Sequence, residues 1–271
     1  MKKNYLLALM AFAVFSCTKT DEIHENQADT TAFSRQFERL QTEPHSLVLK
    51  SKQLAYVKDP VLNDLLQEEA EYPIHKQFSI ETVFLIEEYY EEGKRFILSY
   101  FNEDEQKGIK LFLDYSKLYF TYNNHDYLIS AEISRERCYQ VSIARNEDGK
   151  FFFYLDGVLM DTAVDVASFH GNSDLPLFIG ANGFYSNSAN TSVIYIDEIR
   201  FWKYYRNRDE INHYLFTNIR DVPDYLLGYY NFNNRPSRYI YDFSMYTRDG
   251  RLIHGAEPNS YVHELNCMSY Y

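Results

Sequence analysis

The chain has 271 residues and a formal net charge of −12, and aromatic side chains make up 17% of it, with 26 Tyr and 20 Phe. The acidic charge argues against a nucleic-acid ligand, because neutralising phosphates requires a basic surface. The length suits one large domain with a substantial core, and the abundant aromatic residues favour strands. Neutral glycans, divalent cations and proteins remain open as ligands.

Residues 1–16 are predicted to be a signal peptide. Lys2 and Lys3 precede an apolar run over residues 5–15 that is too short to span a bilayer, and a small residue then meets Cys17. This arrangement resembles a lipoprotein signal, which implies that cleavage leaves Cys17 as the lipid-modified N-terminus. An ordinary secretory signal is the alternative.

Residues 17–45 are polar and short of aromatic residues, as expected of a flexible stalk. Within this stalk, Lys19, Asp21 and Glu22 resemble the signal that sends some Bacteroidetes lipoproteins to the outer face of the outer membrane. We therefore expect a protein anchored by lipid to the outer membrane. Whether it faces the cell surface or the periplasm is left open.

From Ser46 the sequence predicts many short strands. Residues 46–57 provide a first strand and its neighbour, and Pro60 then opens a short helix over residues 60–71 with Leu62, Leu65 and Leu66 on one side. Polar or glycine-containing turns separate the strands expected next, over residues 77–86, 94–101, 108–115, 117–122 and 127–130. This regular spacing predicts a sandwich or jelly roll.

The next strands are expected over residues 138–145 and 151–155. Asp156 and Gly157 tolerate positive φ angles and so predict a tight hairpin into a short partner strand. An apolar strand ending at Gly180 and a long strand over residues 192–202 follow. A helix then opens at Asn207, with Glu210 at capping-box spacing.

The side chains of the long strand over residues 192–202 are expected to alternate between its two faces. Strict alternation places Trp202 on one face with Ile194 and Ile196, and places Asp197 on the other. Both faces are apolar, so we expect the helix that begins at Asn207 to cover the outer one.

The segments KFFFYLDGVLM, PLFIGANGFY and SVIYIDEIRFW follow one another in an order that resembles laminin-G-like proteins of the concanavalin A-like lectin and glucanase superfamily. The resemblance extends over residues 46–255. It implies one all-β domain, a concanavalin A-like jelly-roll β-sandwich with one or two short helices. Residues 256–271 are left as a C-terminal tail.

A catalytic site is not evident. The glucanases of this superfamily carry a Glu-x-Asp-x-Glu strand, which this chain lacks, and residues 103–105 are consecutive acids in a predicted turn. Asp197 and Glu198 are adjacent and so point to opposite faces, and the resemblance implies a structural role for the aspartate. His125 beside Asp126 is interpreted as a solvated turn pair. The chain has neither a Gly-x-Ser-x-Gly elbow nor a His-Glu-x-x-His metal motif. We therefore predict that it is not an enzyme.

Two polar loops combine aromatic residues with Asn and Asp, as glycan sites do, because a ring covers the apolar face of a sugar while polar groups bond its hydroxyls. The alternative is that the Asn residues only form turns and the rings fold back on the sheet. The candidate ligand-binding residues are Tyr122, Asn124, Asp126, Asn182, Tyr185 and Asn187.

Metal and disulfide assignments stay open at this stage. No cofactor is predicted with certainty, but many domains of the resembled family hold calcium, and Asp126, Asp174 and Asp242 are candidate ligands. Cys138 and Cys267 are compatible with one disulfide in an oxidising envelope or with two buried thiols.

Together these features predict a non-catalytic cell-envelope lipoprotein that binds carbohydrate through loops at the sandwich rim. An adhesin or assembly component that binds protein is the alternative from another class. A divergent glycoside hydrolase is a third.

Overall fold

The computed structural model describes residues 46–49, 53–58, 60, 62, 65, 76–87, 93–165, 175–183, 193–233, 238–253, 261–262 and 267. All of these belong to one compact unit, Phe37–Tyr271. Within these ranges, none of the helices combines the length and apolar character that a membrane span requires.

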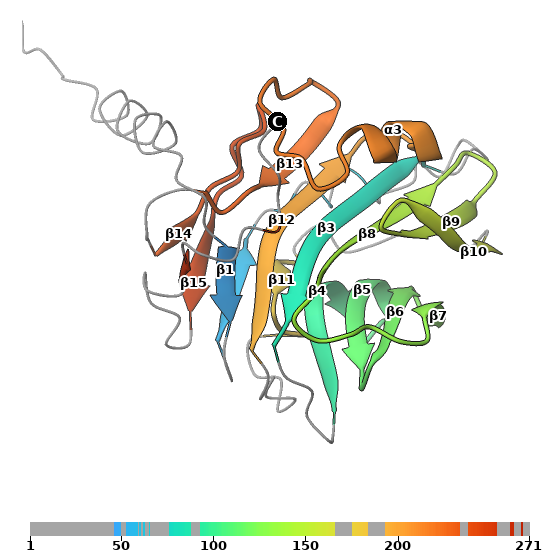
Figure 1. Ribbon diagram of the computed structural model, residues 1–271, viewed down its shortest axis with the longest axis horizontal. Coiled ribbons are helices and arrows are strands. Elements are labelled where there is room, and N and C mark those ends of the chain that lie inside the picture. Colours follow the sequence, from blue (N-terminus) through green and yellow to red (C-terminus); the bar gives the residue numbers. More distant parts are fainter. Residues whose placement is uncertain are drawn as a thin grey trace, which may run out of the picture. The chain divides into compact units, whose positions relative to one another are not determined.

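Two antiparallel sheets face each other across the core, with sheet A in front of sheet B in Figure 1. Sheet A has the order β10-β9-β8-β3-β12-β1-β16, and β13 pairs with β12. Its strands are β1 (Ser46–Leu49), β3 (Phe78–Ile86), β8 (Cys138–Arg145), β9 (Lys150–Leu155), β10 (Val158–Val164), β12 (Ile194–Trp202), β13 (Leu226–Tyr230) and β16 (Tyr261–Val262).

Sheet B has the order β14-β15-β2-β11-β4-β5-β6-β7. Its strands are β2 (Leu54–Val57), β4 (Lys94–Asn102), β5 (Lys107–Asp114), β6 (Lys117–Tyr122), β7 (His125–Ser130), β11 (Leu177–Ile179), β14 (Tyr239–Ile240) and β15 (Gly250–Ile253). The predicted all-β jelly-roll sandwich is thereby confirmed.

The core forms because alternate residues of each strand are apolar and point toward the opposite sheet. Phe120 of β6 in sheet B contacts Phe151 and Phe153 of β9 in sheet A, with ring centroids 5.8 and 6.0 Å apart. Such interdigitated aromatic rings join the two sheets.

The first two strands lie in different sheets. β1 pairs with β12, whereas β2 pairs with β11 and β15. The expectation that they are neighbours in one sheet is wrong, because an apolar pattern does not specify the sheet that a strand joins. Leu62 and Leu65 are buried in the core, but the rest of the predicted helix over residues 60–71 lies outside the described residues.

The hairpin between β9 and β10 is confirmed. Asp156 and Gly157 have φ angles of 50° and 72°, and Val158 pairs with Leu155. Gly157 also has a steric role, because a Cβ there would lie 1.9 Å from the Asn212 side chain of helix α3 (Arg208–His213).

A β-bulge changes the phase of β12. Ile196 pairs with Phe84 and Glu198 with Val83, so Asp197 is an extra residue in the strand. Ile194 and Ile196 before the bulge and Ile199 and Phe201 after it all lie in the core, while Trp202 faces outward. The predicted grouping of Trp202 with the two isoleucines is therefore wrong, because it assumed unbroken alternation.

Helix α3 begins as predicted. Asn207 accepts hydrogen bonds from the backbone of Asp209 and Glu210, and the Glu210 carboxylate accepts one from the Asn207 backbone. The helix packs through Ile211 against β8 and β9. Trp202 is instead covered by the segment that follows the helix, which supplies Tyr214, Ile219 and Val222. The expected outer cover exists, but the helix itself is not the part that covers Trp202.

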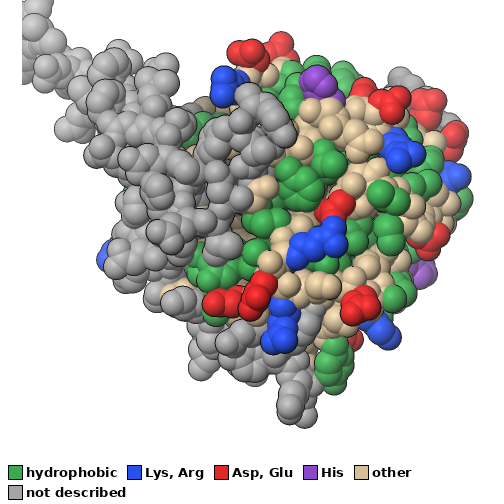
Figure 2. Space-filling view, in the orientation of Figure 1, with side chains coloured by type: hydrophobic (Ala, Val, Ile, Leu, Met, Phe, Trp, Pro, Cys, Tyr) green, Lys and Arg blue, Asp and Glu red, His purple; other side chains and the backbone are tan. Residues whose placement is uncertain are grey.

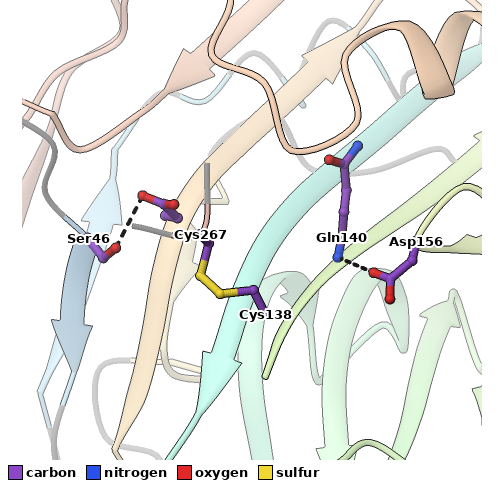
Figure 3. Close-up of a disulfide and its surroundings, with 6 residues drawn as sticks. Ser46, Cys138, Gln140, Asp156 and Cys267 are labelled. Carbon is purple, nitrogen blue, oxygen red and sulfur yellow. Dashed lines mark hydrogen bonds between the residues drawn. A yellow bond between two sulfur atoms is a disulfide. The ribbon is translucent and has the colours of Figure 1, made fainter. Parts of the chain in front are cut away.

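Cys138 and Cys267 form a disulfide with their Cα atoms 5.6 Å apart, which decides between the two alternatives left open by the sequence (Figure 3). The bond joins β8 to a residue near the C-terminus. In the same region, β16 pairs with β1.

Candidate functional site

A row of paired residues crosses sheet B on the face turned away from the core. Within β5, Ile109 and Leu111 lie in the core, so alternation turns Lys110 outward. Lys110 pairs with Ser99 on one side and with Thr121 on the other. The row continues at both ends, and its members in strand order are Tyr239, Arg251, Tyr56, Phe178, Ser99, Lys110, Thr121 and Asp126.

An aromatic strip lies beside this row. Phe96, Phe112 and Tyr119 pair across β4, β5 and β6, with ring centroids 5.6 and 5.5 Å apart. The Nζ atom of Lys94 lies 4.1 Å from the centre of the Phe112 ring. Tyr119 is half-buried and Leu128, its neighbour on β7, is exposed. The open end of the strip therefore presents an aromatic ring beside the polar row.

The chain after β11 folds over the same face. Ala181 packs with Phe178, and the Asn182 side chain accepts a hydrogen bond from Ser99 at 2.9 Å and donates one to Glu103 at 2.5 Å. Glu103 also accepts from Lys110 at 2.8 Å. Partial burial alone would raise the pKa of Glu103, but the hydrogen bonds from Lys110 and Asn182 outweigh it and hold that pKa below its usual range.

A second polar cluster lies at the β7 edge. Thr121 donates to Asp126 at 2.5 Å, and Lys94 Nζ lies 3.6 Å from the other carboxylate oxygen. Lys94 and Asp126 are 45% and 47% exposed, so both can meet a ligand. Three strand spacings separate Ser99 from Asp126, which is roughly 14 Å. We call Lys94, Glu103, Lys110, Tyr119, Asp126 and Asn182 the outer-face site.

The six residues predicted to bind a ligand have different locations. Asp126 and Asn182 lie on the outer face of sheet B, and Asn124 is exposed at the tip of the β6–β7 turn. Tyr185 and Asn187 lie outside the described residues.

Tyr122 corrects the expectation of an exposed ring. It is fully buried, and its ring centre lies 5.0 Å from that of Phe151. The physical reason is the alternation along β6, which directs Leu118, Phe120 and Tyr122 together into the core.

Four residues of the site were not predicted as ligand contacts: Lys94, Glu103, Lys110 and Tyr119. The strands that carry Lys110 and Tyr119 are evident in the sequence, and their position between apolar residues is the signal that could have placed them on the outer face. In the sequence, Glu103 stands out only as one of three consecutive acids. Nothing local links it to Asn182, which is 79 residues away.

Two of the candidate calcium ligands, Asp126 and Asp242, lie far apart. Asp126 belongs to β7 and Asp242 follows β14, at opposite edges of sheet B. Asp242 is buried and accepts hydrogen bonds from the backbone of Tyr229, Ser244 and Arg248. Asp174 lies outside the described residues. Among the residues that are described, no group of three His, Cys, Asp or Glu side chains is arranged to hold a metal ion.

The remaining acidic candidates occupy sheet A and its edge. Asp197 and Glu198 are buried, and Asp197 accepts a hydrogen bond from Ser46 while Arg200 donates twice to Glu198. His125 and Asp126, interpreted from the sequence as a solvated turn pair, are both exposed at the start of β7, and the Nδ1 atom of His125 lies 3.5 Å from Asp165.

Comparisons with known proteins agree with this architecture. The profile of the concanavalin A-like lectin/glucanases superfamily matches residues 65–212. No curated protein sequence matches the chain.

Among solved structures, a candidate carbohydrate-binding protein from Bacteroides ovatus is similar with a TM-score of 0.60 and 15% identity, over 79% of this chain and 59% of that one. A structure of botulinum neurotoxin type C, described as dependent on two ganglioside molecules for cell entry, has a TM-score of 0.47 and 15% identity, over 70% and 47% of the chains. The present chain thus spans less than two thirds of either structure. With a family match over more than half its length and the two-sheet fold described above, the chain belongs to the concanavalin A-like lectin/glucanases superfamily.

Proposed function

We propose that the domain is a non-catalytic carbohydrate-binding module whose ligand lies on the outer face of sheet B. The observation that carries this proposal is the aromatic strip ending at Tyr119, on the same face of sheet B as the amide of Asn182 and the carboxylates of Glu103 and Asp126. A ring supplies area for the apolar face of a sugar, and amide and carboxylate groups bond its hydroxyls. The description of the Bacteroides ovatus protein as a candidate carbohydrate-binding protein supports the same ligand class.

The site is poorly suited to glycoside hydrolysis. That reaction needs a carboxylic acid held protonated at neutral pH, which requires a raised pKa. Glu103 has a lowered pKa. Asp197 does have a raised pKa, but it is buried in sheet A. These features support binding rather than turnover.

Binding can be tested by screening the purified domain against a panel of immobilised glycans and measuring the affinity of a hit by calorimetry. Tyr119→Ala and Asn182→Ala should each weaken binding about tenfold or more in protein that remains folded at the assay temperature, since about 1.4 kcal/mol corresponds to a factor of ten. Tyr204→Ala is the matched control, because Tyr204 is 51% exposed and follows β12 of sheet A. Retention of no glycan, or an equal loss in the control, would refute the proposal. Tyr185→Ala and Asn187→Ala remain predicted to weaken binding as well.

We further propose that the domain is held at the outer membrane by lipid on Cys17. The support is the sequence alone, in which a short apolar run precedes that cysteine. Cys17→Ala should remove the protein from the membrane fraction and leave an uncleaved or soluble form. Unchanged partition into membranes would contradict the anchor, and protease added to intact cells would show which side the domain faces.

Protein binding is the second candidate function, favoured by β10. This edge strand of sheet A exposes four large apolar residues. Their exposed fractions are 53% for Val158, 45% for Leu159, 45% for Met160 and 68% for Val164. Exposed apolar residues on a sheet edge are a surface on which a partner strand can pair. Figure 2 shows the side of sheet A, where apolar side chains are interspersed with charges of both signs. A partner captured from cell-envelope extract by the wild type and lost with Leu159→Lys/Val164→Lys would favour this function.

A further inference from the structure

Both lysines of the outer-face site have an acidic partner. Lys94 lies 3.6 Å from Asp126, and Lys110 lies 2.8 Å from Glu103. The two ion pairs involve different strands and turns, so each positive charge of the site is balanced by a nearby negative charge.

Each of these lysines also lies over the face of an aromatic ring. The Nζ atom of Lys110 lies 3.6 Å from the centre of the Phe101 ring, and that of Lys94 lies 4.1 Å from the centre of the Phe112 ring. A cation over a ring face is attracted by the ring quadrupole. Each ammonium group therefore has two favourable partners already, and an anionic ligand would have to compete with both.

The hydrogen-bonding capacity that remains on this face suits a neutral ligand. A carboxylate has about four acceptor positions, and an amide has two donor and two acceptor positions. Glu103 is 52% exposed and Asp126 is 47% exposed, so lone pairs of both are open to solvent. Hydroxyl groups can bond these oxygens without breaking either ion pair.

The two clusters also set a length. Asn182 and Glu103 lie over β4 and β5, and Asp126 lies on β7, so a ligand that contacts both must extend across strands by roughly 14 Å. Tyr119 lies on β6, the strand beside β7. Resting on the proposed function, we propose that the ligand is a neutral oligosaccharide, longer than one sugar unit, that lies across β4 to β7.

Calorimetry with neutral oligosaccharides of increasing length, and with galacturonate oligosaccharides of the same lengths, tests this assignment. The affinity for the neutral series should rise with length and then level off, and should change less than about twofold between low and high salt, because the interaction involves no net charge. The galacturonate series should bind at least about tenfold more weakly. Tighter binding of galacturonate than of the neutral series, or equal affinity for a monosaccharide and its oligomers, would overturn the inference while leaving carbohydrate binding intact. Absence of binding to either series would instead count against the proposed function.

A charge variant provides a gain-of-function test. Glu103→Gln/Asp126→Asn removes both acidic partners, so Lys94 and Lys110 become available and the variant should acquire salt-sensitive binding of galacturonate oligosaccharides. The control Asp221→Asn/Asp224→Asn makes the same change in net charge at two exposed acids between α3 and β13, and should not acquire it. Equal gain in both variants would show that overall charge, and not the matched pairs, excludes anions.

Discussion

At the scale of single residues, the bulge in β12 gives two adjacent acids different environments. Asp197, the extra residue, accepts a hydrogen bond from Ser46, which Figure 3 shows near the Cys138–Cys267 disulfide. Burial, and then the charge of Glu198, raise the pKa of Asp197 to about 8. Glu198 instead faces Arg200. Burial alone would lower the pKa of Arg200, but the carboxylates of Glu198 and Glu81 hold that pKa above its ordinary value.

The raised pKa of Asp197 predicts a pH-dependent stability. The folded state binds this proton more tightly than the unfolded state does. The resulting contribution to the free energy of unfolding is therefore complete at low pH and is lost as the pH rises toward 8. Asp197→Asn should remove that slope, which is at most about 1.4 kcal/mol per pH unit. Urea denaturation of both proteins at a series of pH values between about 4 and 8 measures it. Parallel stability curves would contradict the prediction.

Trp202 is the other residue with a specific consequence. It is fully buried, stacks with Tyr214 at 5.9 Å between ring centres and lies beneath the guanidinium of Arg206 at 3.8 Å. Trp202→Ala should lower the free energy of unfolding by about 3 to 5 kcal/mol, because it removes a large buried ring and leaves a cavity. A change below about 1 kcal/mol in chemical denaturation would show that the side chain is not packed as described.

At the scale of elements, a buried charge cluster attaches the segment after α3 to sheet A. Arg200 donates to Glu198 and Glu81 and also to the backbone carbonyls of Tyr214 and Thr217. The carbonyl bonds place the covering segment above Trp202. The cluster therefore acts as an attachment point between sheet A and its cover, and its carboxylates are not open to a substrate.

Arg200→Met tests this attachment. It should lower the free energy of unfolding by about 3 to 5 kcal/mol, because the buried carboxylate of Glu198 loses its cation and that of Glu81 keeps only Arg206. Arg137→Met is the matched control, since Arg137 forms an exposed ion pair with Asp156, and it should cost less than about 1 kcal/mol. Equal effects in thermal or urea unfolding would contradict the role assigned to Arg200.

The elements also show which features a sequence can predict. The Asp156-Gly157 hairpin and the capping box at Asn207 were predicted because each depends on contacts within a few residues. The sheet to which β2 belongs and the bulge at Asp197 depend on partners far along the chain. Propensity and periodicity contain little information on such pairing.

At the scale of the whole domain, the outer-face site also combines local features that the sequence predicts with long-range contacts that it does not. The sequence identified Asp126 and Asn182, but it could not show that β11 lies beside β4 and so brings Asn182 to Ser99 and Glu103. It also included Tyr122, whose burial follows from the alternation of a strand that was itself predicted. Each strand can thus be predicted from its own residues, whereas the site depends on the order of the strands in sheet B.

The central claim is that a glycan occupies the outer face of sheet B, and hydrogen–deuterium exchange with a bound neutral oligosaccharide tests it most directly. The ligand should slow exchange in the β4–β5 turn, residues 103–106, and in the β6–β7 turn at residues 123–124. Exchange in β9, β10 and residues 203–225 should not change, because these lie on sheet A and its cover. Protection confined to sheet A, with the two turns of sheet B unaffected at saturating ligand, would contradict the account.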